Sequence, residues 1–517
     1  NTAARGFGTS DLNKMGEDLR RTLNAAGQTV DGSYQQFYYG VNTSGLIVNR
    51  LFPEVVAGEE NPFQFNRSVR AATADYFDNT DELQSFFGRI NYSIADKYLF
   101  TGTFRADGSS RFGPENQYGF FPSGAFAWQI GEEDFIGESV STLKLRLSGG
   151  LIGNQEGLGY GNFVARQRFA GLGINNDNTV NQNGLSIVAT DVPDLKWETT
   201  LDLTVGLDFG FNMDRLSGSI DVYRRETNDL LLQTPPAAPS TIPFQFGNVD
   251  ASVINQGIEF AIAYDFVQTE DTNFGMSFNI AYNDNEIQDF AGSINTGEIN
   301  GPGLSGAFAQ RFEAGNCLFS YYMAEFLGFD DEGNPTYLDV DGNGIGDPDS
   351  DKFFVGEDGL PDITSGLSLT FRHKNWDASA FFNGQFGFSV YNNTANSFFN
   401  AGQLTTARNV TQSVVDSGEN GGASTAVSTR FLEKGDFVRF QNATIGYNVP
   451  LSGDGAFKGL RFSLTGQNLA LWTDYSGIDP EVTVATGTLG SGIPVRGIDW
   501  AAFPNPLTVT FGINATF

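Results

Sequence analysis

Acidic residues gather in one short stretch whose spacing is that of a calcium-binding loop. Between residues 339 and 351 the sequence reads DVDGNGIGDPDSD. Asp339, Asp341 and Asn343 take the first, third and fifth places of such a loop, and Asp347 takes the ninth. Oxygen ligands at these places converge on one point, and Ca²⁺ prefers hard oxygen ligands. The spacing therefore predicts a calcium site.

The same stretch departs from the calcium motif near its end. Gly344 supplies the sharp turn at the sixth place, but the hydrophobic residue Ile345 comes one place early, and Ser350 stands where the motif has a bidentate glutamate. Asp349 or Asp351 would have to replace that glutamate. A solvated acidic turn is the alternative, and both interpretations remain open. The predicted metal ligands are Asp339, Asp341, Asn343, Ile345, Asp347, Asp349 and Asp351.

Other residue types that carry chemistry are scarce. Cys317 is the only cysteine, so the chain can form neither an internal disulfide nor a cysteine-based zinc site. His373 is the only histidine, and its alternating surroundings, LSLTFRHKNW, predict a strand-end residue rather than a catalytic one. Nothing in the sequence positions any two of the 61 acidic residues as the pair that glycoside hydrolysis needs. We therefore expect no enzyme.

Two further groups of residues have a binding interpretation and a structural one. Polar side chains between Arg105 and Phe112 could contact a substrate, but we favour a turn at Asp107 and Gly108 and arginine–carboxylate pairs inside a polar lumen. Aromatic residues near the ends of predicted strands could stack on sugars, but we favour an aromatic belt at a membrane interface. These aromatic residues are Trp197, Trp376, Trp472, Tyr475 and Trp500.

Net charge restricts the partners. The chain carries 30 Lys and Arg against 61 Asp and Glu, which gives a formal charge of −31. A nucleic-acid partner needs a basic surface, so nucleic acid is excluded.

The elements that must position these residues are strands. The stretch from Thr199 to Phe211, TTLDLTVGLDFGF, has apolar residues at every second position and small or polar residues between them. Such a strand has one apolar and one polar face. We expect Leu201, Val205 and Phe209 to meet lipid and Asp202, Thr204 and Asp208 to face a lumen.

Similar runs recur roughly a dozen times, and each is about the length that crosses a bilayer as a tilted strand. No run approaches the roughly 20 apolar residues of a spanning helix. The sequence predicts an all-β fold, a transmembrane antiparallel β-barrel with long extracellular loops. The other runs begin near residue 86 and include 97–105, 118–130, 143–151, 216–224, 258–266, 274–282, 367–373, 376–390, 437–449, 460–468 and 507–517.

Connections between these runs alternate in length. Asn212 to Asp214 and Lys374 to Asn375 are short, whereas the insertions 153–192, 284–316 and 392–429 are long. Outer-membrane barrels have tight turns on the periplasmic side and long loops outside. The alternation therefore favours such a barrel over a soluble sandwich.

Several motifs resemble those of the SusC/RagA family of TonB-dependent outer-membrane transporters from Bacteroidota. They occur in the family's order and cover roughly residues 85 to 517, and the final run ends on Phe517, as the insertion signal of outer-membrane proteins does. The motifs are FRADGSSRFGPENQYGFFPS from Phe104, LKLRLSGGLIGNQ from Leu143, PDLKWETT from Pro193, RLSGSIDVYRRETNDLLL from Arg215, NQGIE from Asn255, PTYLDVDGNG from Pro335, PDITSGLSLTF from Pro361, FVRFQNATIGYNVP from Phe437 and GQNLALWTDYSGIDPEV from Gly466.

The resemblance implies a 22-stranded barrel closed by an N-terminal plug and covered by a SusD-like lipoprotein. TonB would act on a periplasmic segment to admit an oligosaccharide or an oligopeptide across the outer membrane of a Gram-negative, Bacteroidota-type cell. We expect this chain to lack the plug and the TonB-contacting segment, which are N-terminal in the family. We expect residues 1–85 to be an extracellular loop region with entering strands and residues 86–517 to be the C-terminal strands of the barrel.

A dozen strands cannot enclose a barrel of that size, so we expect upstream plug and barrel strands, in the same polypeptide or another chain, to complete it in the outer-membrane lipid. Two other functions remain open. One is a passive porin or structural outer-membrane barrel, and the other is a soluble secreted all-β adhesin or carbohydrate-binding protein.

Overall fold

A computed structural model describes most of the chain. The residues described are 2–5, 78–159, 161, 163–164, 166–174, 180–189, 191–234, 245–299, 301, 304, 306–421, 426–451, 457–482 and 495–517. None of their helices has the length and apolar character needed to span a membrane. Most of the predicted loop region 1–85 lies outside the described residues, so that assignment stays a prediction.

The chain divides into two compact units. The first comprises residues 1–84 and 109–111, and the second comprises 85–108 and 112–517. In the first unit, β1 (Thr2–Arg5) pairs antiparallel with β2 (Asp78–Asp81). Arg111 forms an ion pair of 2.7 Å with Asp81 there.

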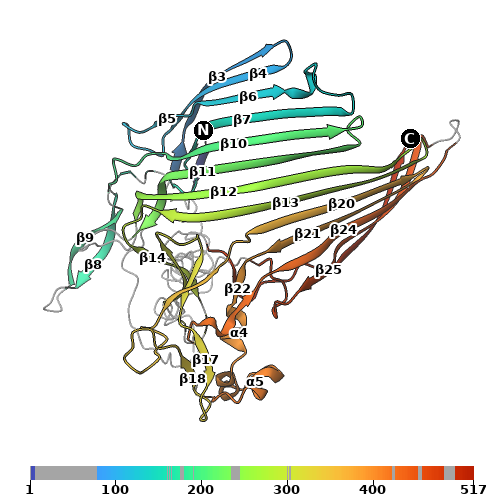
Figure 1. Ribbon diagram of the computed structural model, residues 1–517. Coiled ribbons are helices and arrows are strands. Elements are labelled where there is room, and N and C mark those ends of the chain that lie inside the picture. The colour runs from blue at the N-terminus through green and yellow to red at the C-terminus, as the bar shows by residue number, and fades with distance from the viewer. Residues whose placement is uncertain are drawn as a thin grey trace, which may run out of the picture. The chain divides into compact units, whose positions relative to one another are not determined.

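One large antiparallel sheet contains the predicted runs (Figure 1). Its strands are hydrogen-bonded in the order β27-β25-β24-β21-β20-β13-β12-β11-β10-β7-β6-β4-β3, and β5 pairs with β4. The strands are β3 (Leu83–Ile94), β4 (Tyr98–Ser109), β5 (Tyr118–Phe120), β6 (Ser123–Gln129), β7 (Val140–Asn154), β10 (Glu198–Phe211), β11 (Leu216–Thr234), β12 (Gln245–Gln268), β13 (Thr272–Gln288), β20 (Ile363–His373), β21 (Trp376–Phe386), β24 (Phe437–Asn448), β25 (Gly459–Thr473) and β27 (Thr508–Thr516).

The predicted all-β class and antiparallel pairing are confirmed, with two corrections to the runs. The run 118–130 divides into β5 and β6 at Pro122, which cannot donate a ladder hydrogen bond. The run 376–390 ends as β21 at Phe386, because Gly387 takes a φ of 78° and turns the chain out of the sheet. The residues that follow form β22 (Ser389–Asn392), which pairs with other strands.

The strands have an apolar and a polar face, as the alternation predicts. On β10, Leu203 and Val205 are 48% and 50% exposed. Val205 lies beside Leu147 of β7 and Val222 of β11, so the apolar residues of neighbouring strands form a continuous surface. On the opposite face, Asp202 and Asp208 form ion pairs with arginines of adjacent strands.

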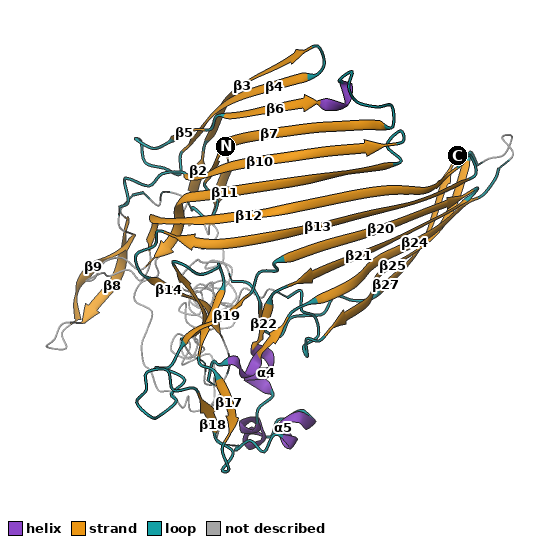
Figure 2. Cartoon of the chain, in the orientation of Figure 1, coloured by secondary structure: helices purple, strands orange, loops and turns teal. Residues whose placement is uncertain are grey.

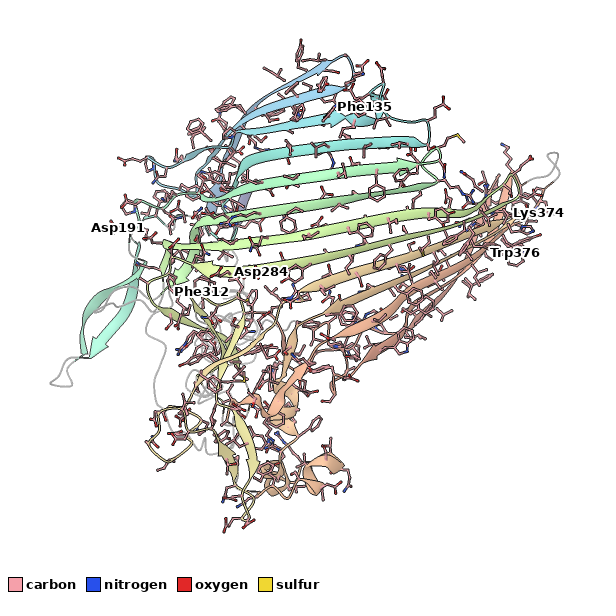
Figure 3. The ribbon with its side chains drawn as sticks, in the orientation of Figure 1. Phe135, Asp191, Asp284, Phe312, Lys374 and Trp376 are labelled. Atoms are coloured by element: carbon pink, nitrogen blue, oxygen red, sulfur yellow. The ribbon has the colours of Figure 1, made fainter. Side chains whose placement is uncertain are left out.

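Connections sort by length at the two ends of the sheet (Figures 1 and 2). Short turns of residues 95–97, 212–215, 269–271 and 374–375 lie at one end. Long connections of residues 289–362, 387–436 and 474–507 leave from the other end. Lys374 and Trp376 mark the first end, and Asp284 marks the second (Figure 3). The predicted asymmetry of the loops is confirmed.

Smaller sheets and short helices are built from these long connections. They contain β14 (Ser293–Ile299), β15 (Ala307–Glu313), β16 (Ser320–Met323), β17 (Phe326–Phe329), β18 (Pro335–Tyr337), β19 (Phe353–Asp358), β22, β23 (Leu432–Lys434) and β26 (Ile498–Asp499), with α4 (Asn393–Phe398), η3 (Ala401–Thr406), α5 (Gln412–Asp416) and η4 (Thr429–Phe431). The connection between β7 and β10 contains the hairpin of β8 (Arg166–Ile174) and β9 (Val180–Ala189), and η2 (Ile130–Glu132) follows β6.

Candidate functional site

The described residues of the three long connections 289–362, 387–436 and 474–507 pack together and are called the loop assembly here. Their shared core contains Tyr321, Met323, Tyr391 and Ile498, all fully buried. The Tyr321 hydroxyl lies 2.9 Å from the carbonyl oxygen of Ser389. Because residues from three distant segments meet in one core, the loop assembly is an ordered surface at the end of the sheet, suited to binding.

The acidic stretch 339–351 folds around the buried carboxylate of Asp351. That carboxylate accepts hydrogen bonds from the backbone N–H groups of Val340 at 2.9 Å, Asp341 at 3.1 Å and Asp347 at 2.8 Å. These N–H donors, Asp347 first, keep the pKa of Asp351 below its usual value. The carboxylate of Asp339 accepts the backbone N–H of Gly344 at 2.7 Å. The stretch is therefore a closed loop held by its own carboxylates.

The structure brings three of the predicted ligands together. Asp339, Asp341 and Asp351 each offer a carboxylate oxygen, and these oxygens lie within 4.8 Å of one another. Three carboxylate oxygens are a donor set that suits Ca²⁺. Calcium binding by this loop stays a prediction.

The other predicted ligands are outside this acidic group. Asp349 has a side chain that is 92% exposed and lies 3.6 Å from Lys352. Asp347 uses one carboxylate oxygen to accept the N–H of Asp349 at 2.9 Å. The side-chain oxygen of Asn343 accepts the backbone N–H of Ile345 at 2.8 Å, so this contact closes the turn.

A second acidic group lies where the loop assembly meets the sheet. Burial, together with repulsion from Asp362 and Glu357, raises the pKa of Asp358 to about 6. Burial and the charges of Asp284 and Asp436 raise the pKa of Asp362. The carboxyl of Asp358 therefore changes protonation close to neutral pH.

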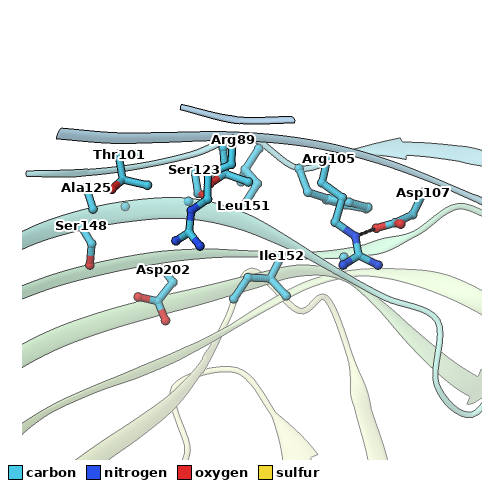
Figure 4. Close-up of a pocket in the computed structure, with 16 residues that line it drawn as sticks. Arg89, Thr101, Arg105, Asp107, Ser123, Ala125, Ser148, Leu151, Ile152 and Asp202 are labelled. Atoms are coloured by element: carbon cyan, nitrogen blue, oxygen red, sulfur yellow. Dashed lines mark hydrogen bonds and ion pairs between the residues drawn. The ribbon is translucent and has the colours of Figure 1, made fainter. Parts of the chain in front are cut away.

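The polar face of the sheet has a hollow of about 620 Å³ between β3, β4, β6, β7 and β10 (Figure 4). Arg89, Arg105, Asp107, Ser148 and Asp202 line it. The Arg105 Nε atom is 2.5 Å from Asp107, and this ion pair spans one side of the hollow (Figure 4). A volume of this size admits a small ligand or part of an oligomer.

In the 105–112 stretch, the predicted arginine–carboxylate pairs are confirmed, whereas the predicted turn at Asp107 and Gly108 is wrong. Arg105 pairs with Asp107, and Arg111 pairs with Asp81. Asp107 and Gly108 lie inside β4, where they pair with Gly119 and Tyr118 of β5. The polar side chain of Asp107 faces the hollow, so no turn is needed to expose it.

Two of the aromatic residues predicted as a membrane belt, Trp197 and Tyr475, are buried instead. Trp197 is 8% exposed and packs against Phe112 and Phe121 with ring centroids 4.9 and 5.5 Å away. Tyr475 is 5% exposed. Trp500 is half-buried and stacks on Phe398. A strand-end position alone does not distinguish an aromatic residue at the interface from one that packs beneath a loop.

Trp376 and Trp472 are the exposed members of that group, at 51% and 53%. Trp376 packs against Tyr447 with ring centroids 4.7 Å apart. Their place in a membrane belt stays a prediction. His373 ends β20, as predicted, and its Nδ1 is 2.8 Å from the Thr272 hydroxyl.

Sequence reasoning missed a pocket in the loop assembly, called the aromatic pocket here. It has a volume of about 570 Å³, and its lining includes Phe329, Phe399, Phe431 and Ile478. Arg430 lines it as well, with its guanidinium 4.6 Å from the Phe431 ring centroid. The residues come from separate loops without periodic spacing, so the sequence holds no signal that groups them.

Comparison with known proteins supports one family. The family described as TonB dependent receptor-like, beta-barrel matches residues 2–469. The chain is 33% identical over 477 residues to TonB-dependent receptor P26 of Formosa agariphila, covering 86% of this chain and 47% of that protein. It is 31% identical over 510 residues to TonB-dependent receptor SusC of Bacteroides thetaiotaomicron, covering 90% of this chain and 48% of that protein.

A solved structure agrees with this result. The structure of the RagAB peptide transporter matches with a TM-score of 0.73 and 26% identity, covering 87% of this chain and 49% of that chain. The chain spans about half the length of the curated relatives it matches.

Proposed function

Because the chain belongs to the family of TonB-dependent receptor-like β-barrels, we propose that it serves active, TonB-dependent import of an oligosaccharide or an oligopeptide across the outer membrane. Three observations together support this proposal. The antiparallel sheet has one apolar and one polar face, its short and long connections lie at opposite ends, and the chain is similar to SusC and to the RagAB peptide transporter. These relatives are receptors and transporters, which are not enzymes.

The barrel of the transporter needs strands besides those of the large sheet. Among the described residues, β3 pairs only with β4, and β27 pairs only with β25. Every residue of β3 is exposed. Unpaired backbone groups in lipid cost several kcal/mol each. Further strands, from the same polypeptide or another chain, would pair with both edges and close the barrel around a plug.

The loop assembly is the surface that a SusD-like lipoprotein would cover. Phe503 and Ile478 are 91% and 67% exposed there. A lipoprotein lid would bury these two apolar side chains. TonB would act on the plug region, and the polar face of the sheet would line the path of the substrate.

Uptake of labelled oligomers by cells that carry the full-length gene tests the proposal. Import is expected to stop when TonB is deleted or the proton-motive force is collapsed, although surface binding continues. A passive porin would keep transporting under both conditions. A soluble adhesin would be recovered in the aqueous phase without detergent.

A further inference from the structure

Among the described residues, two carboxylates of the aromatic pocket have no cationic partner. Glu433 and Asp499 both line it. Glu433 is 2.7 Å from the backbone N–H and 2.7 Å from the hydroxyl of Ser476. Asp499, which is 6% exposed, accepts the Tyr475 hydroxyl at 2.8 Å and the Thr394 hydroxyl at 3.2 Å. Within the described part of the chain, neither carboxylate forms an ion pair.

Arg430, the arginine among the described residues of the pocket wall, does not compensate for these charges. The guanidinium of Arg430 donates to both carboxylate oxygens of Glu419, at 2.5 and 3.1 Å. The side chain of Glu419 is 1% exposed, so this ion pair is buried. The Arg430 guanidinium also lies 4.9 Å from the Phe329 ring centroid. Arg430 is therefore neutralised and fixed, and the pocket keeps a negative charge that favours a cationic ligand.

Around Glu433 and Asp499 the pocket offers a ligand acceptors rather than donors, because the neighbouring hydroxyl and amide hydrogens are already engaged. The Ser476 hydroxyl donates to Glu433, and the Thr394 hydroxyl donates to Asp499. The amide of Asn392 donates to Glu433 and accepts the backbone N–H of Ala395. A sugar hydroxyl both donates and accepts, whereas a cation needs only acceptors with a remaining lone pair, so this arrangement favours a cation.

The rest of the lining suits an apolar side chain. Phe399 is 38% exposed and Ile478 is 67% exposed, so both present free apolar surface at the pocket. Aromatic faces also attract a desolvated cation. A ligand with a positive group next to an apolar side chain would satisfy both parts of the pocket.

We propose that the aromatic pocket binds an oligopeptide through a positively charged group, its amino terminus or a basic side chain, held by Glu433 and Asp499 beside an apolar residue on Phe399 and Ile478. This inference rests on the proposed import function and narrows its substrate class from oligosaccharide or oligopeptide to peptide. The two sources of positive charge share one chemistry, and the test separates them.

The test measures binding by calorimetry to the full-length transporter in detergent. The probes are four versions of one apolar peptide, with a lysine or a norleucine and with a free or an acetylated amino terminus, and an uncharged malto-oligosaccharide. A peptide with at least one positive group is expected to bind about tenfold more tightly than the acetylated norleucine peptide. If only the free amino terminus raises affinity, the cation is the terminus; if only lysine does, it is the side chain.

Charge-neutral variants locate the site. Glu433→Gln and Asp499→Asn are each expected to weaken binding of the charged peptides about tenfold and leave the uncharged peptide unchanged. Glu332→Gln, at an exposed acidic residue outside the pocket lining, is the matched control and is expected to bind like the wild type. Ile478→Ala, at an exposed position, is expected to weaken all four peptides without unfolding the protein.

Two results would overturn the inference. One is wild-type affinity for charged peptides in both Glu433→Gln and Asp499→Asn, and the other is binding of the malto-oligosaccharide with no peptide bound. If only the malto-oligosaccharide binds and its uptake depends on TonB, the proposed import function would still be supported. Loss of TonB dependence for every probe would instead contradict the import function itself.

Discussion

Arg146 on β7 holds Asp208 on β10 with a two-pronged ion pair on the polar face of the sheet. The Nε atom is 2.9 and 3.0 Å from the two carboxylate oxygens of Asp208, and Nη2 is 2.7 Å from one of them. Nη2 also lies 2.9 Å from Asp221 on β11. One arginine therefore connects three neighbouring strands and separates two carboxylates that would otherwise repel each other.

Replacing this arginine should weaken the sheet. Arg146→Ala leaves two partly buried carboxylates without their cation, and we expect it to lower the free energy of unfolding by about 1–3 kcal/mol. Arg146→Lys keeps the charge but loses the two-pronged geometry, so its effect should be smaller. Urea unfolding of the full-length protein in detergent measures both. Equal stability of Arg146→Ala and wild type would show that the ion pair contributes nothing.

Two adjacent residues of β10 test the assignment of faces. Val205 is 50% exposed on the apolar face, whereas Thr204 points to the polar face and donates to Asp202 at 3.0 Å. In a bilayer, Val205→Arg should lower the free energy of unfolding by about 2–4 kcal/mol, because it places a charge in lipid. Thr204→Arg places the same charge beside a carboxylate and should be tolerated far better. Unfolding in lipid vesicles measures the stability of both variants. An equal loss of stability in the two would contradict the assignment of the faces of β10.

The strands were predictable because their signal is local. Alternation at Thr199–Phe211 sets both the extended conformation and the face of each residue, so β10 was predicted to within one residue. The ends of longer strands were not predictable. β11 continues to Thr234 through a register shift between Asn228 and Leu230, and an extra residue at such a bulge breaks the alternation.

The loop assembly was not predictable for the opposite reason. Tyr321, Tyr391 and Ile498 are far apart in the sequence. Their packing depends on tertiary contacts, which produce no periodic pattern in the sequence. The same holds for the aromatic pocket, where Glu433 and Asp499 come from different loops. By contrast, the acidic loop 339–351 closes through contacts between near neighbours, so its residues could be identified from spacing.

A pH effect should follow from Asp358. Its pKa in the folded protein, about 6, lies above its usual value of 3.8, so the folded state binds the proton more tightly than the unfolded state. The charged form destabilises the fold above that pKa, and stability should rise as pH falls from about 7 to about 5. Asp358→Asn should remove this rise while keeping an acceptor for the Leu360 N–H. Thermal unfolding across this range measures the difference, and an unchanged pH dependence in the variant would assign the effect to another group.

Calcium should stabilise the loop 339–351 if Asp339, Asp341 and Asp351 act as ligands. Saturation at about 100 times the dissociation constant should add about 2.7 kcal/mol to the stability of this loop, measured by hydrogen exchange with calcium and with a chelator. Asp351→Asn is uninformative alone, because this carboxylate also accepts the backbone N–H groups of Val340 and Asp347. Asp341→Asn is the sharper variant: its side chain is exposed, and asparagine keeps an oxygen to accept the backbone N–H of Asn343, so the calcium effect should disappear while the loop keeps its fold. Exchange rates that are identical with calcium and chelator in the wild type would instead identify a solvated acidic turn, closed by its own hydrogen bonds.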